Sequence, residues 1–464
     1  MHKLILLISS FVIFFIFSCK KDSFITSSDA SINFSSDTLY FDTVFVSSGS
    51  ITQFVKIINP NNQKLLLKSV KLMGGNNSVF KINIDGNSTT EADNIELGPN
   101  DSMYVFVSVL INSSNTSLTF IVQDSLQVLF NGNQRYIQLQ AYGQKAHFLS
   151  NVTIATPTTW PNDLPYVILG SLQIDSNASL TIQKGCKVYF HASAPLIVEG
   201  TLNVQGADSA RVYFLSDRLD YPYNSFPGSW PGIYFMQSSK DNQLTFAVIK
   251  NAFQGVVAQN LSTSSNPKLT LNDCIIDNIY DAGILGAQTN ITAQNCLVSN
   301  CGRNIVLGYG GGYSFTNCTI ASFSNDYISH ISPVLTISNY LVTSGGTLSA
   351  DITASFVNCI IWGDNGTVHD EVVASELGSG LFKVSLANCL WKVQDIPANV
   401  SYSSMLTMDP MFDNINNQFM YYDFHLKAGS PAIDAGQFTA IPFDLDGNPR
   451  VVGNATDIGC FEKQ

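Results

Sequence analysis

The chain has few charged residues, and this scarcity limits the classes of protein it can belong to. Asp, Glu, Lys and Arg make up 12% of its 464 residues, about half the usual ~25%. The polar positions are filled mostly by Asn, Ser, Thr and Gln, which favour turns. With a formal net charge of −12, the chain also lacks the basic face that nucleic acids require. We therefore predict no nucleic-acid partner.

Amphipathic helices are scarce as well. Beyond the N-terminal segment, no long stretch repeats its apolar residues with a helical period. Apolar residues still make up 45% of the chain, enough for a large core, and many of them alternate with polar ones as in strands. We therefore predict an all-β protein. At ~150 residues per domain, its length suggests two or three domains.

The N-terminus has the features of an export signal. His2 and Lys3 precede the apolar run "LILLISSFVIFFIF", and "SCKKD" follows it. The run is shorter than the ~20 residues that span a bilayer. It resembles a bacterial lipoprotein signal, in which residues 1–18 are removed and Cys19 is lipidated. A plain signal peptide and a membrane anchor are the alternatives.

The start of the mature chain, "CKKDS", resembles that of many Bacteroidetes lipoproteins. The resemblance implies a lipid anchor in the outer membrane, with the protein facing the periplasm or the cell surface. Residues 19–31 are polar and lack periodicity, so we predict that they form a tether.

Residues 32–147 are predicted to form an immunoglobulin-like β-sandwich. Stretches such as "DTLYFDTVFV", "TQFVKIIN" and "SMYVFVSVLI" alternate apolar and polar residues, and turn clusters such as "NPNNQ" and "GGNN" separate them. Strands spaced by about 8–12 residues are typical of this fold. About seven strands fit the segment, and it contains no cysteine for a disulfide.

Five cysteines occur in one recurring frame. They are separated by 22, 22, 41 and 30 residues, and each follows an Asn or Asp: Cys274, Cys296, Cys318, Cys359 and Cys389. Apolar residues stand three and five positions before each cysteine, apart from an occasional Ala, and two positions after it. A strand repeat of ~20–25 residues without helices indicates a β-solenoid. We predict a right-handed parallel β-helix of about 12 coils over residues 148–424.

The frame also predicts how a coil turns. We number positions relative to the cysteine, so that −3 is the third residue before it. In a straight strand, residues an odd number of positions apart face opposite sides, yet position −3 and the cysteine are both apolar, so the chain must bend between them. Asn and Asp tolerate the left-handed dihedrals of such a corner. In stacked coils these side chains are expected to form a hydrogen-bonded ladder, built from Asp273, Asn295, Asn317, Asn358 and Asn388.

The cysteines themselves have three possible roles. Stacked residues have Cβ atoms ~4.8 Å apart, whereas a disulfide prefers ~3.8 Å. A metal site needs ligands that converge on a point, and a linear stack does not converge. We therefore predict that the cysteines form a structural core ladder, with Cys296–Cys301 as an alternative pair. No metal or cofactor is predicted.

The C-terminal segment, residues 425–464, carries a motif series. It contains "SPAIDAG" at 430–436, "DLDGNPR" at 444–450 and "DIGCFE" at 457–462. The series is similar to the choice-of-anchor segment of bacterial surface β-helix proteins, with Cys460 in place of the usual Ala. The mature chain also resembles uncharacterised Bacteroidetes β-helix lipoproteins of the pectate-lyase-like superfamily. These resemblances imply a β-helix, a C-terminal cap and a cell-envelope location, but no activity.

The sequence offers few candidates for a catalytic site. Pectate lyases and polygalacturonases, which parallel β-helices resemble, need clustered carboxylates with a cationic group, or paired Asp residues. Between residues 251 and 399 the only arginine is Arg303, and Asp273, Asp277 and Asp281 straddle a corner and a loop. No catalytic residue is predicted.

Three other polar motifs occur in the second half of the chain. Asp326 and His330 form one weak pair, and "HDE" at 369–371 is expected to be a solvated loop. "DLDG" has Ca²⁺-like spacing but lacks the Glu that closes an EF-hand loop. A salt bridge of Arg450 with Asp444 or Asp457 is therefore the expected arrangement.

Two further groups of residues are candidates for ligand contact or modification. The interruption "SDRLDYPYNSFPGSWPG" carries aromatic residues that would stack on sugar rings or pin the loop to the coil: Tyr221, Tyr223, Phe226 and Trp230. Asp followed by Ser or Thr and an apolar residue resembles the Bacteroidetes O-glycosylation motif, although such pairs are also common in turns. It occurs at Thr38, Thr43, Ser102, Ser125 and Ser209.

Together these features favour a non-catalytic, lipid-anchored cell-envelope protein that binds or displays a glycan. The alternative is a polysaccharide lyase or glycoside hydrolase, and a third option is a structural spacer. Nothing in the sequence indicates an oligomer.

Overall fold

The computed structural model describes residues 23–45, 50–111 and 119–464. The chain divides into two compact units between Lys145 and Ala146. The predicted signal segment and Cys19 lie outside the described residues. The described part is nearly all β, with two short 3₁₀ helices, Gly75–Asn77 and Tyr223–Ser225.

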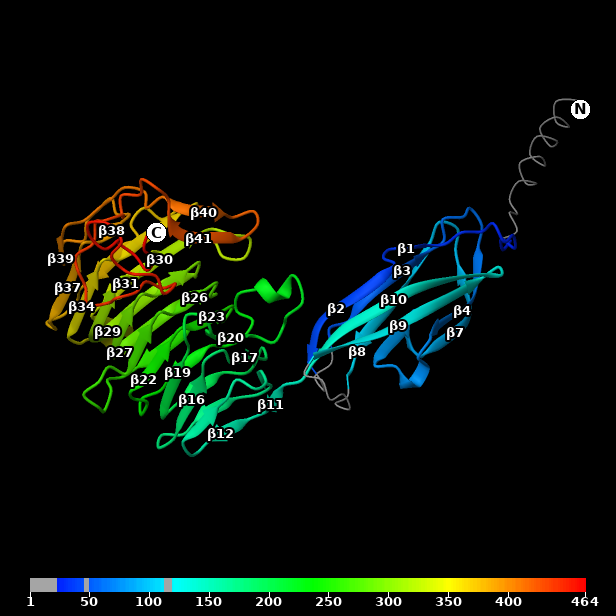
Figure 1. Cartoon of the computed structure of the whole chain (residues 1–464), viewed down its shortest axis with the longest axis horizontal. Coiled ribbons are helices and arrows are strands. Elements are labelled where there is room, and N and C mark those ends of the chain that lie inside the picture. Colours follow the sequence, from blue (N-terminus) through cyan, green and yellow to red (C-terminus); the bar gives the residue numbers. More distant parts are fainter. Residues whose placement is uncertain (1–22, 46–49, 112–118) are drawn as a thin grey trace, which may run out of the picture. The chain divides into compact units, whose positions relative to one another are not determined.

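The first unit is the predicted β-sandwich (Figure 1). One five-stranded sheet has the order β1 (Asn33–Phe34), β3 (Gln53–Ile58), β8 (Ser102–Val109), β5 (Phe80–Ile84) and β6 (Asn87–Ser88). The other has the order β2 (Thr38–Phe45), β10 (Asn133–Gln144), β9 (Thr119–Phe130), β4 (Leu65–Leu72) and β7 (Glu91–Leu97). Only β2 and β10 pair in parallel, while the other described pairs are antiparallel.

The two sheets enclose one core. Val55 and Val105 from the first sheet, and Leu67 and Val128 from the second, are completely buried in the same apolar cluster. Their polar neighbours point outward because successive strand residues face opposite sides. The immunoglobulin-like sandwich is therefore confirmed, with more strands than the seven that the pattern predicted.

The second half of the segment predicted as a tether lies on the sandwich. Ile25 N–H donates to the Lys64 carbonyl at 2.8 Å. The Asn131 side chain donates to the carbonyls of Ile25 and Ser27 at 2.9 and 3.0 Å, and Ala30 is buried. These residues of the predicted tether therefore pack on the sandwich.

The second unit is a right-handed parallel β-helix (Figure 1). Each coil adds one strand to a ten-stranded parallel sheet. The order of this sheet is β11 (His147–Leu149), β14 (Tyr166–Ile168), β17 (Lys187–Phe190), β20 (Val212–Ser216), β23 (Ala247–Lys250), β26 (Ile275–Asp277), β28 (Leu297–Ser299), β30 (Thr319–Phe323), β35 (Ile360–Asp364) and β38 (Leu390–Trp391).

The remaining strands of the coils form a 17-stranded sheet. Its first strands are β12 (Val152–Ile154), β13 (Thr158–Trp160), β15 (Leu172–Ile174), β16 (Ser179–Gln183), β18 (Leu196–Val198), β19 (Thr201–Gln205), β21 (Ile233–Phe235) and β22 (Asn242–Thr245). They continue with β24 (Val256–Gln259), β25 (Leu269–Asn272), β27 (Ala282–Gln294), β29 (Arg303–Thr316), β31 (Leu335–Ser338), β34 (Ile352–Val357), β36 (Val372–Ser375), β37 (Phe382–Ala387) and β39 (Val400–Ser403).

The register of the coils confirms the frame read from the cysteines. Position −5 aligns as Leu269, Ile291, Tyr313, Ala354 and Val384. Position +2 aligns as Ile276, Val298, Ile320, Ile361 and Trp391. The residues at position −1 have φ between 49° and 55°, so the predicted left-handed corner is present in every copy.

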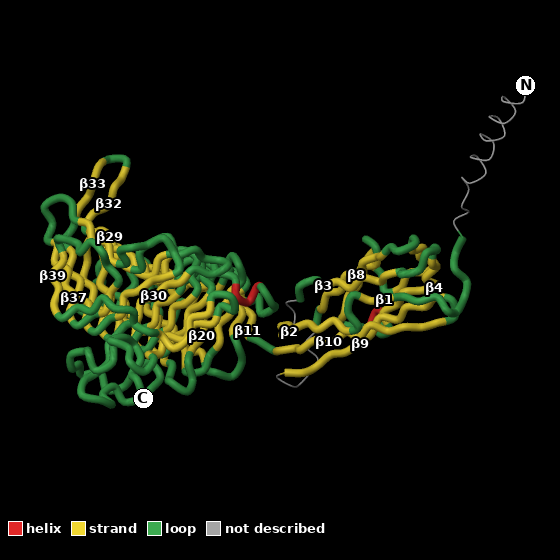
Figure 2. The backbone as a smooth tube through the Cα atoms, turned by 90° about the horizontal axis from the view of Figure 1, so that it is seen from above, coloured by secondary structure: helices red, strands yellow, loops and turns green. Residues whose placement is uncertain are grey.

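The stack is shorter than predicted. Its ten-stranded sheet corresponds to ten coils rather than about 12, and the last strand, β39, ends at Ser403 rather than near 424. Insertions account for much of the difference, among them the loop around residues 217–229. Another is the hairpin of β32 (Tyr340–Thr343) and β33 (Gly346–Ser349), which stands away from the β-helix (Figure 2).

The C-terminal segment lies along the side of the stack, whereas a cap was predicted. Its hairpin, β40 (Phe412–Asn416) with β41 (Tyr421–Leu426), starts a second apolar core outside the coils. There the outer side chains of the ten-stranded sheet pack against the C-terminal segment; the cluster includes Leu297, Phe323, Ile360, Leu390, Phe412, Phe424, Leu445 and Ile458. Where the C-terminal segment covers it, between β26 and β38, the outer face of this sheet is largely apolar.

Candidate binding surfaces

The cysteine ladder is structural. All eight described cysteines are free and buried, so the alternative Cys296–Cys301 disulfide is wrong. Cys296 Sγ–H lies 3.2 Å from the Gln294 carbonyl and 3.6 Å from the Leu271 carbonyl of the preceding coil. The other four ladder cysteines repeat this arrangement. Each thiol therefore fills the corner and hydrogen-bonds a carbonyl there.

These thiols are unsuited to chemistry. Burial raises the pKa of Cys296 and Cys359 well above the usual value of a thiol, whereas for Cys318, despite its burial, hydrogen bonds from these two neighbours lower the pKa. A reactive cysteine must also be accessible, and all five ladder cysteines are buried. They therefore act as small buried side chains.

The asparagine ladder is present but shared with the C-terminal segment. Asn295 donates to Asp273 at 3.0 Å, and Asn358 donates to Asn317 at 2.9 Å. Asn358 also donates to the Gln437 carbonyl and accepts from Gln437 N–H. The ladder thus fastens the C-terminal segment to the coils.

The predicted aromatic contacts divide into buried and exposed side chains. Trp230 is completely buried, stacks on Phe190 with ring centres 4.4 Å apart, and donates from Nε1 to the Lys250 carbonyl at 2.9 Å. It is a core residue and cannot contact a ligand. Tyr221 is 84% exposed and Tyr223 is 41% exposed.

Phe226 joins the loop to another insertion. Its ring centre lies 5.0 Å from that of Tyr223 and 4.8 Å from that of Tyr327. The loop is therefore held partly by its own aromatics, which was the alternative considered for it.

The five predicted glycosylation positions differ in access. Thr38, Thr43, Ser102 and Ser125 lie in strands of the sandwich and are half-buried. Ser209 lies in an exposed turn of the β-helix. Ser209 is therefore the most accessible of the five to a modifying enzyme.

The "HDE" stretch was predicted to be a solvated loop, and this is only partly so: His369 is exposed and Asp370 half-buried, but Glu371 is buried. Glu371 is completely buried and pairs with His330, which is 2% exposed, with 2.8 Å between Oε1 and Nε2. Glu371 Oε2 also accepts from Val334 N–H at 3.1 Å. A side chain at Gly363 would collide with both partners. The pair joins two loops and has no access to substrate.

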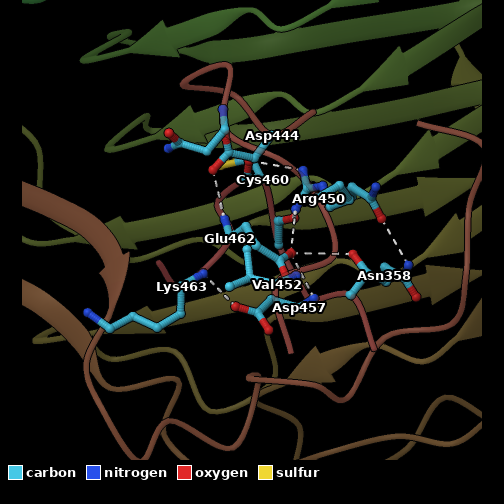
Figure 3. Close-up of polar contacts among 12 residues, drawn as sticks. Asn358, Asp444, Arg450, Val452, Asp457, Cys460, Glu462 and Lys463 are labelled. Atoms are coloured by element: carbon cyan, nitrogen blue, oxygen red, sulfur yellow. Dashed lines mark hydrogen bonds and ion pairs between the residues drawn. The ribbon is translucent and has the colours of Figure 1, made fainter. Parts of the chain in front are cut away.

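The expected salt bridge of Arg450 has a different partner. The guanidinium lies 3.9 Å from Glu462 and donates to the carbonyls of Gly459 and Cys460 at 3.0 and 3.1 Å (Figure 3). It also donates to Asn295 of the corner ladder. Among the described contacts of Arg450, none is an ion pair with Asp444 or Asp457.

His425 joins β41 to the "DLDG" turn. Its ring nitrogens lie 2.5 Å from Asp423 and 2.8 Å from Asp446. These bonds, led by that to Asp446, raise the pKa of His425 from 6.5 to about 9. Burial raises the pKa of Glu462 from 4.5 to about 7 despite the nearby Arg450.

We expect the C-terminal segment to be held more weakly as the pH rises. The contribution of His425 is complete below pH 6.5 and is lost as the pH rises through about 9. That of Glu462 is complete below pH 4.5 and is lost towards pH 7. Hydrogen exchange of residues 421–464 at pH 6 and pH 9.5 measures this, after correction for intrinsic exchange rates. In His425→Gln the change above pH 7 should disappear, and persistence of the full change would contradict the assignment.

The acidic residues of the coils do not converge. Asp273 accepts from Asn295, Asp277 pairs with Lys250 at 2.8 Å, and Asp281 pairs with Arg303. Within the described ranges there is no group of three or more His, Cys, Asp or Glu residues placed to hold a metal ion. The described acids therefore do not form the constellation that the lyase hypothesis requires.

A continuous row of uncharged polar residues runs along the 17-stranded sheet. We call it the polar column. It takes one outward residue from each of ten successive strands: Thr159, Thr181, Asn203, Gln243, Thr270, Thr292, Ser314, Ser355, Ser385 and Ser401. All are exposed or half-buried. Neighbouring strands lie about 4.8 Å apart, so the column repeats at that distance.

Most of the column remains free to bind a partner. Within the described part of the chain, the hydroxyls of Thr181, Thr270 and Thr292 make no hydrogen bond to the protein, whereas Ser401 donates to the Val384 carbonyl at 3.0 Å. The sequence contains the signal for this surface, because position −4 of the cysteine frame is Thr or Ser in every copy. The same cysteine frame that predicts the buried positions of each coil therefore also indicates this outward polar position.

Comparisons with known proteins identify no relative in sequence. No known family and no curated protein matches the chain. Among solved structures, pectate lyase Pel9A is 12% identical and has a TM-score of 0.34, over 69% of this chain and 88% of its own. A family 123 glycoside hydrolase from Clostridium perfringens is 7% identical with a TM-score of 0.18, over 26% of this chain and 30% of its own.

A third solved structure covers a similar share of this chain. It is a PapD-like domain of human CEP192, 9% identical with a TM-score of 0.18, over 27% of this chain and 92% of its own. Similarities this remote say nothing about activity. No helix among the described residues is long and apolar enough to cross a membrane.

Proposed function

We propose that this is a non-catalytic, lipid-anchored cell-envelope protein that binds an extended neutral polysaccharide along the polar column. The column offers hydroxyl and amide groups, one residue per coil, over ten strands. This observation carries the proposal. An extended β-linked glycan presents hydroxyl groups at a similar repeat, so successive sugar units could face successive coils.

The absence of charge within the column determines the class of polymer. None of its residues is charged, so an acidic glycan would gain no ion pair there. Hydroxyls and amides both donate and accept hydrogen bonds, as sugar hydroxyls do. A neutral glycan is therefore the better fit than the acidic polymers cleaved by lyases.

Three substitutions test the column. The triple variant Thr181→Val, Thr270→Val and Thr292→Val removes hydroxyls with little change in shape. At about 1 kcal/mol for each lost bond, its affinity for a neutral β-glucan should fall about a hundredfold. Gel-retardation electrophoresis with soluble β-glucan measures the change.

The controls use hydroxyls from a different row. Thr153→Val and Thr336→Val lie on β12 and β31, outside the column, and should leave retardation unchanged. Equal retardation of the triple variant and the wild type would contradict the proposal. Release of reducing ends from the glucan would favour a glycoside hydrolase instead, and release of unsaturated products from an acidic glycan such as polygalacturonate would favour a lyase.

The proposed lipid anchor depends on the resemblance of the residues before Cys19 to a bacterial lipoprotein signal. Growth with labelled fatty acid should label the wild type but not Cys19→Ala in the native host. Retention of the label in that variant would contradict the anchor without affecting the column.

A further inference from the structure

A polar cavity of about 170 Å³ lies on the outer face of the ten-stranded sheet. Its floor comes from strands β20, β23 and β26 and the corners that follow β23, β26 and β28. Its walls come from the loop at 224–225, from Asn325 and from the β40–β41 hairpin. The lining residues are Leu215, Asn224, Ser225, Lys250, Asn251, Asp277, Asn278, Asn300, Asn325, Met420 and Tyr422.

The floor carries one ion pair whose charges cancel. Lys250 Nζ lies 2.8 Å from Asp277 Oδ2, and Ser299 Oγ donates to Asp277 Oδ1 at 2.8 Å. The Asp277 charge raises the pKa of Lys250, so the ammonium stays protonated. Because the two charges cancel, the pair gives no net attraction to an anionic or a cationic ligand. The pair still offers hydrogen-bond donors and acceptors to a neutral ligand.

A second row of asparagines fixes the wall to the floor. Asn251 and Asn278 have φ of 62° and 57°, and the Asn278 amide donates to Asn251 Oδ1 at 2.8 Å. Asn251 also donates to the Asn224 carbonyl at 2.7 Å, and Asn278 to the Ser225 carbonyl at 2.8 Å. The loop that was predicted to contact sugars through its aromatic side chains thus forms one wall of the cavity. It is held there by hydrogen bonds to its backbone carbonyls. A site formed before the ligand arrives loses less entropy on binding.

The opposite wall carries an unsatisfied hydroxyl. Tyr422 Oη is buried and makes no hydrogen bond of normal geometry among the described residues, although the Asn325 side chain lies near enough to interact with it. Burial raises its pKa to about 12 despite a slight lowering by Asn325, so the phenol remains neutral and able to donate. Buried polar atoms are nearly always paired with protein, water or ligand. A hydroxyl group of a ligand in the cavity would supply the missing partner.

We propose that this cavity binds a single neutral sugar unit, such as a chain end or branch. Its volume is below the roughly 300–1,000 Å³ of typical ligand pockets, so it fits one ring rather than an oligosaccharide. The proposal takes the ligand class, a glycan, from the proposed function but uses none of the residues of the polar column. The two sites can therefore be tested separately.

Titration calorimetry with glucose, galactose, N-acetylglucosamine and galacturonate tests the cavity. At least one neutral sugar should bind, and galacturonate should bind more weakly. Tyr422→Phe should weaken that binding about tenfold, the equivalent of one buried hydrogen bond, and Asn224→Ala should weaken it too. Tyr402→Phe, on an exposed tyrosine of β39, is the matched control and should bind normally.

Three outcomes would overturn the proposal: no heat with any neutral sugar, unchanged affinity in a folded Tyr422→Phe, or tighter binding of galacturonate. An unchanged thermal unfolding midpoint shows that the variant is folded. The triple column variant should bind the monosaccharide normally. Loss of polymer binding in that variant with intact monosaccharide binding would support two separate sites, and loss of monosaccharide binding there would contradict a cavity independent of the column.

Discussion

Replacing Arg450 by alanine should lower the free energy of unfolding of the β-helix unit by about 3–5 kcal/mol, as when one partner of a buried ion pair is removed. The guanidinium is 2% exposed. Its loss would leave the Gly459 carbonyl without its side-chain donor, remove one of the two donors to the Cys460 carbonyl, and leave the buried Glu462 carboxylate without its cation. It would also remove the link from the C-terminal segment to Asn295. Urea unfolding followed by tryptophan fluorescence measures the change.

Arg303→Ala is the matched control for this experiment. Arg303 pairs with Asp281, but its side chain is 40% exposed, so the cost should be about 1 kcal/mol or less. Trypsin should release the C-terminal segment faster from Arg450→Ala than from Arg303→Ala under native conditions. Equal costs in the two variants would show that the segment is not fastened by Arg450.

Glu371→Ala should also be strongly destabilising, by about 3 kcal/mol or more. The substitution leaves two buried groups unpaired: His330 Nε2 loses its hydrogen-bond partner, and the Val334 N–H loses its acceptor. Glu376→Ala, five residues further on in an exposed loop, should change stability by no more than about 0.5 kcal/mol. Urea unfolding of both variants gives the comparison, and a cost below 1 kcal/mol for Glu371→Ala would contradict the role assigned to the pair.

The coil geometry was predictable because it repeats. The residue before each cysteine turns the corner in every copy, with Asn358 at φ 53° as one example, and the apolar positions stack in register. A repeat gives the same physical signal several times, so chance matches are rejected. The sandwich was predictable from alternation for a similar reason.

The features missed depend on contacts between distant segments. Glu371 lies in a polar stretch, and its burial follows from the loop that brings His330 over it. Trp230 stands in a turn-rich insertion, yet its ring stacks on Phe190 in the core. The side-on course of residues 435–446 depends on the asparagine ladder, whose amides provide its partners. None of these pairings leaves a local pattern.

The outer faces of the ten-stranded and 17-stranded sheets therefore have different proposed roles. The outer face of the ten-stranded sheet is largely covered by the C-terminal segment, apart from the polar cavity near Lys250 and Asp277. The outward column of the 17-stranded sheet is uncharged and carries free hydroxyls. The first face stabilises the stack, and the second is the proposed site of polymer binding.

Affinity as a function of glycan length tests the central claim most directly. Titration calorimetry with β-glucan oligosaccharides of increasing length should show affinity rising with each added unit, as more coils are engaged, without formation of products. An affinity that is already maximal for a disaccharide would contradict a binding site extending along the polar column. So would cleavage of the longer oligosaccharides during the titration.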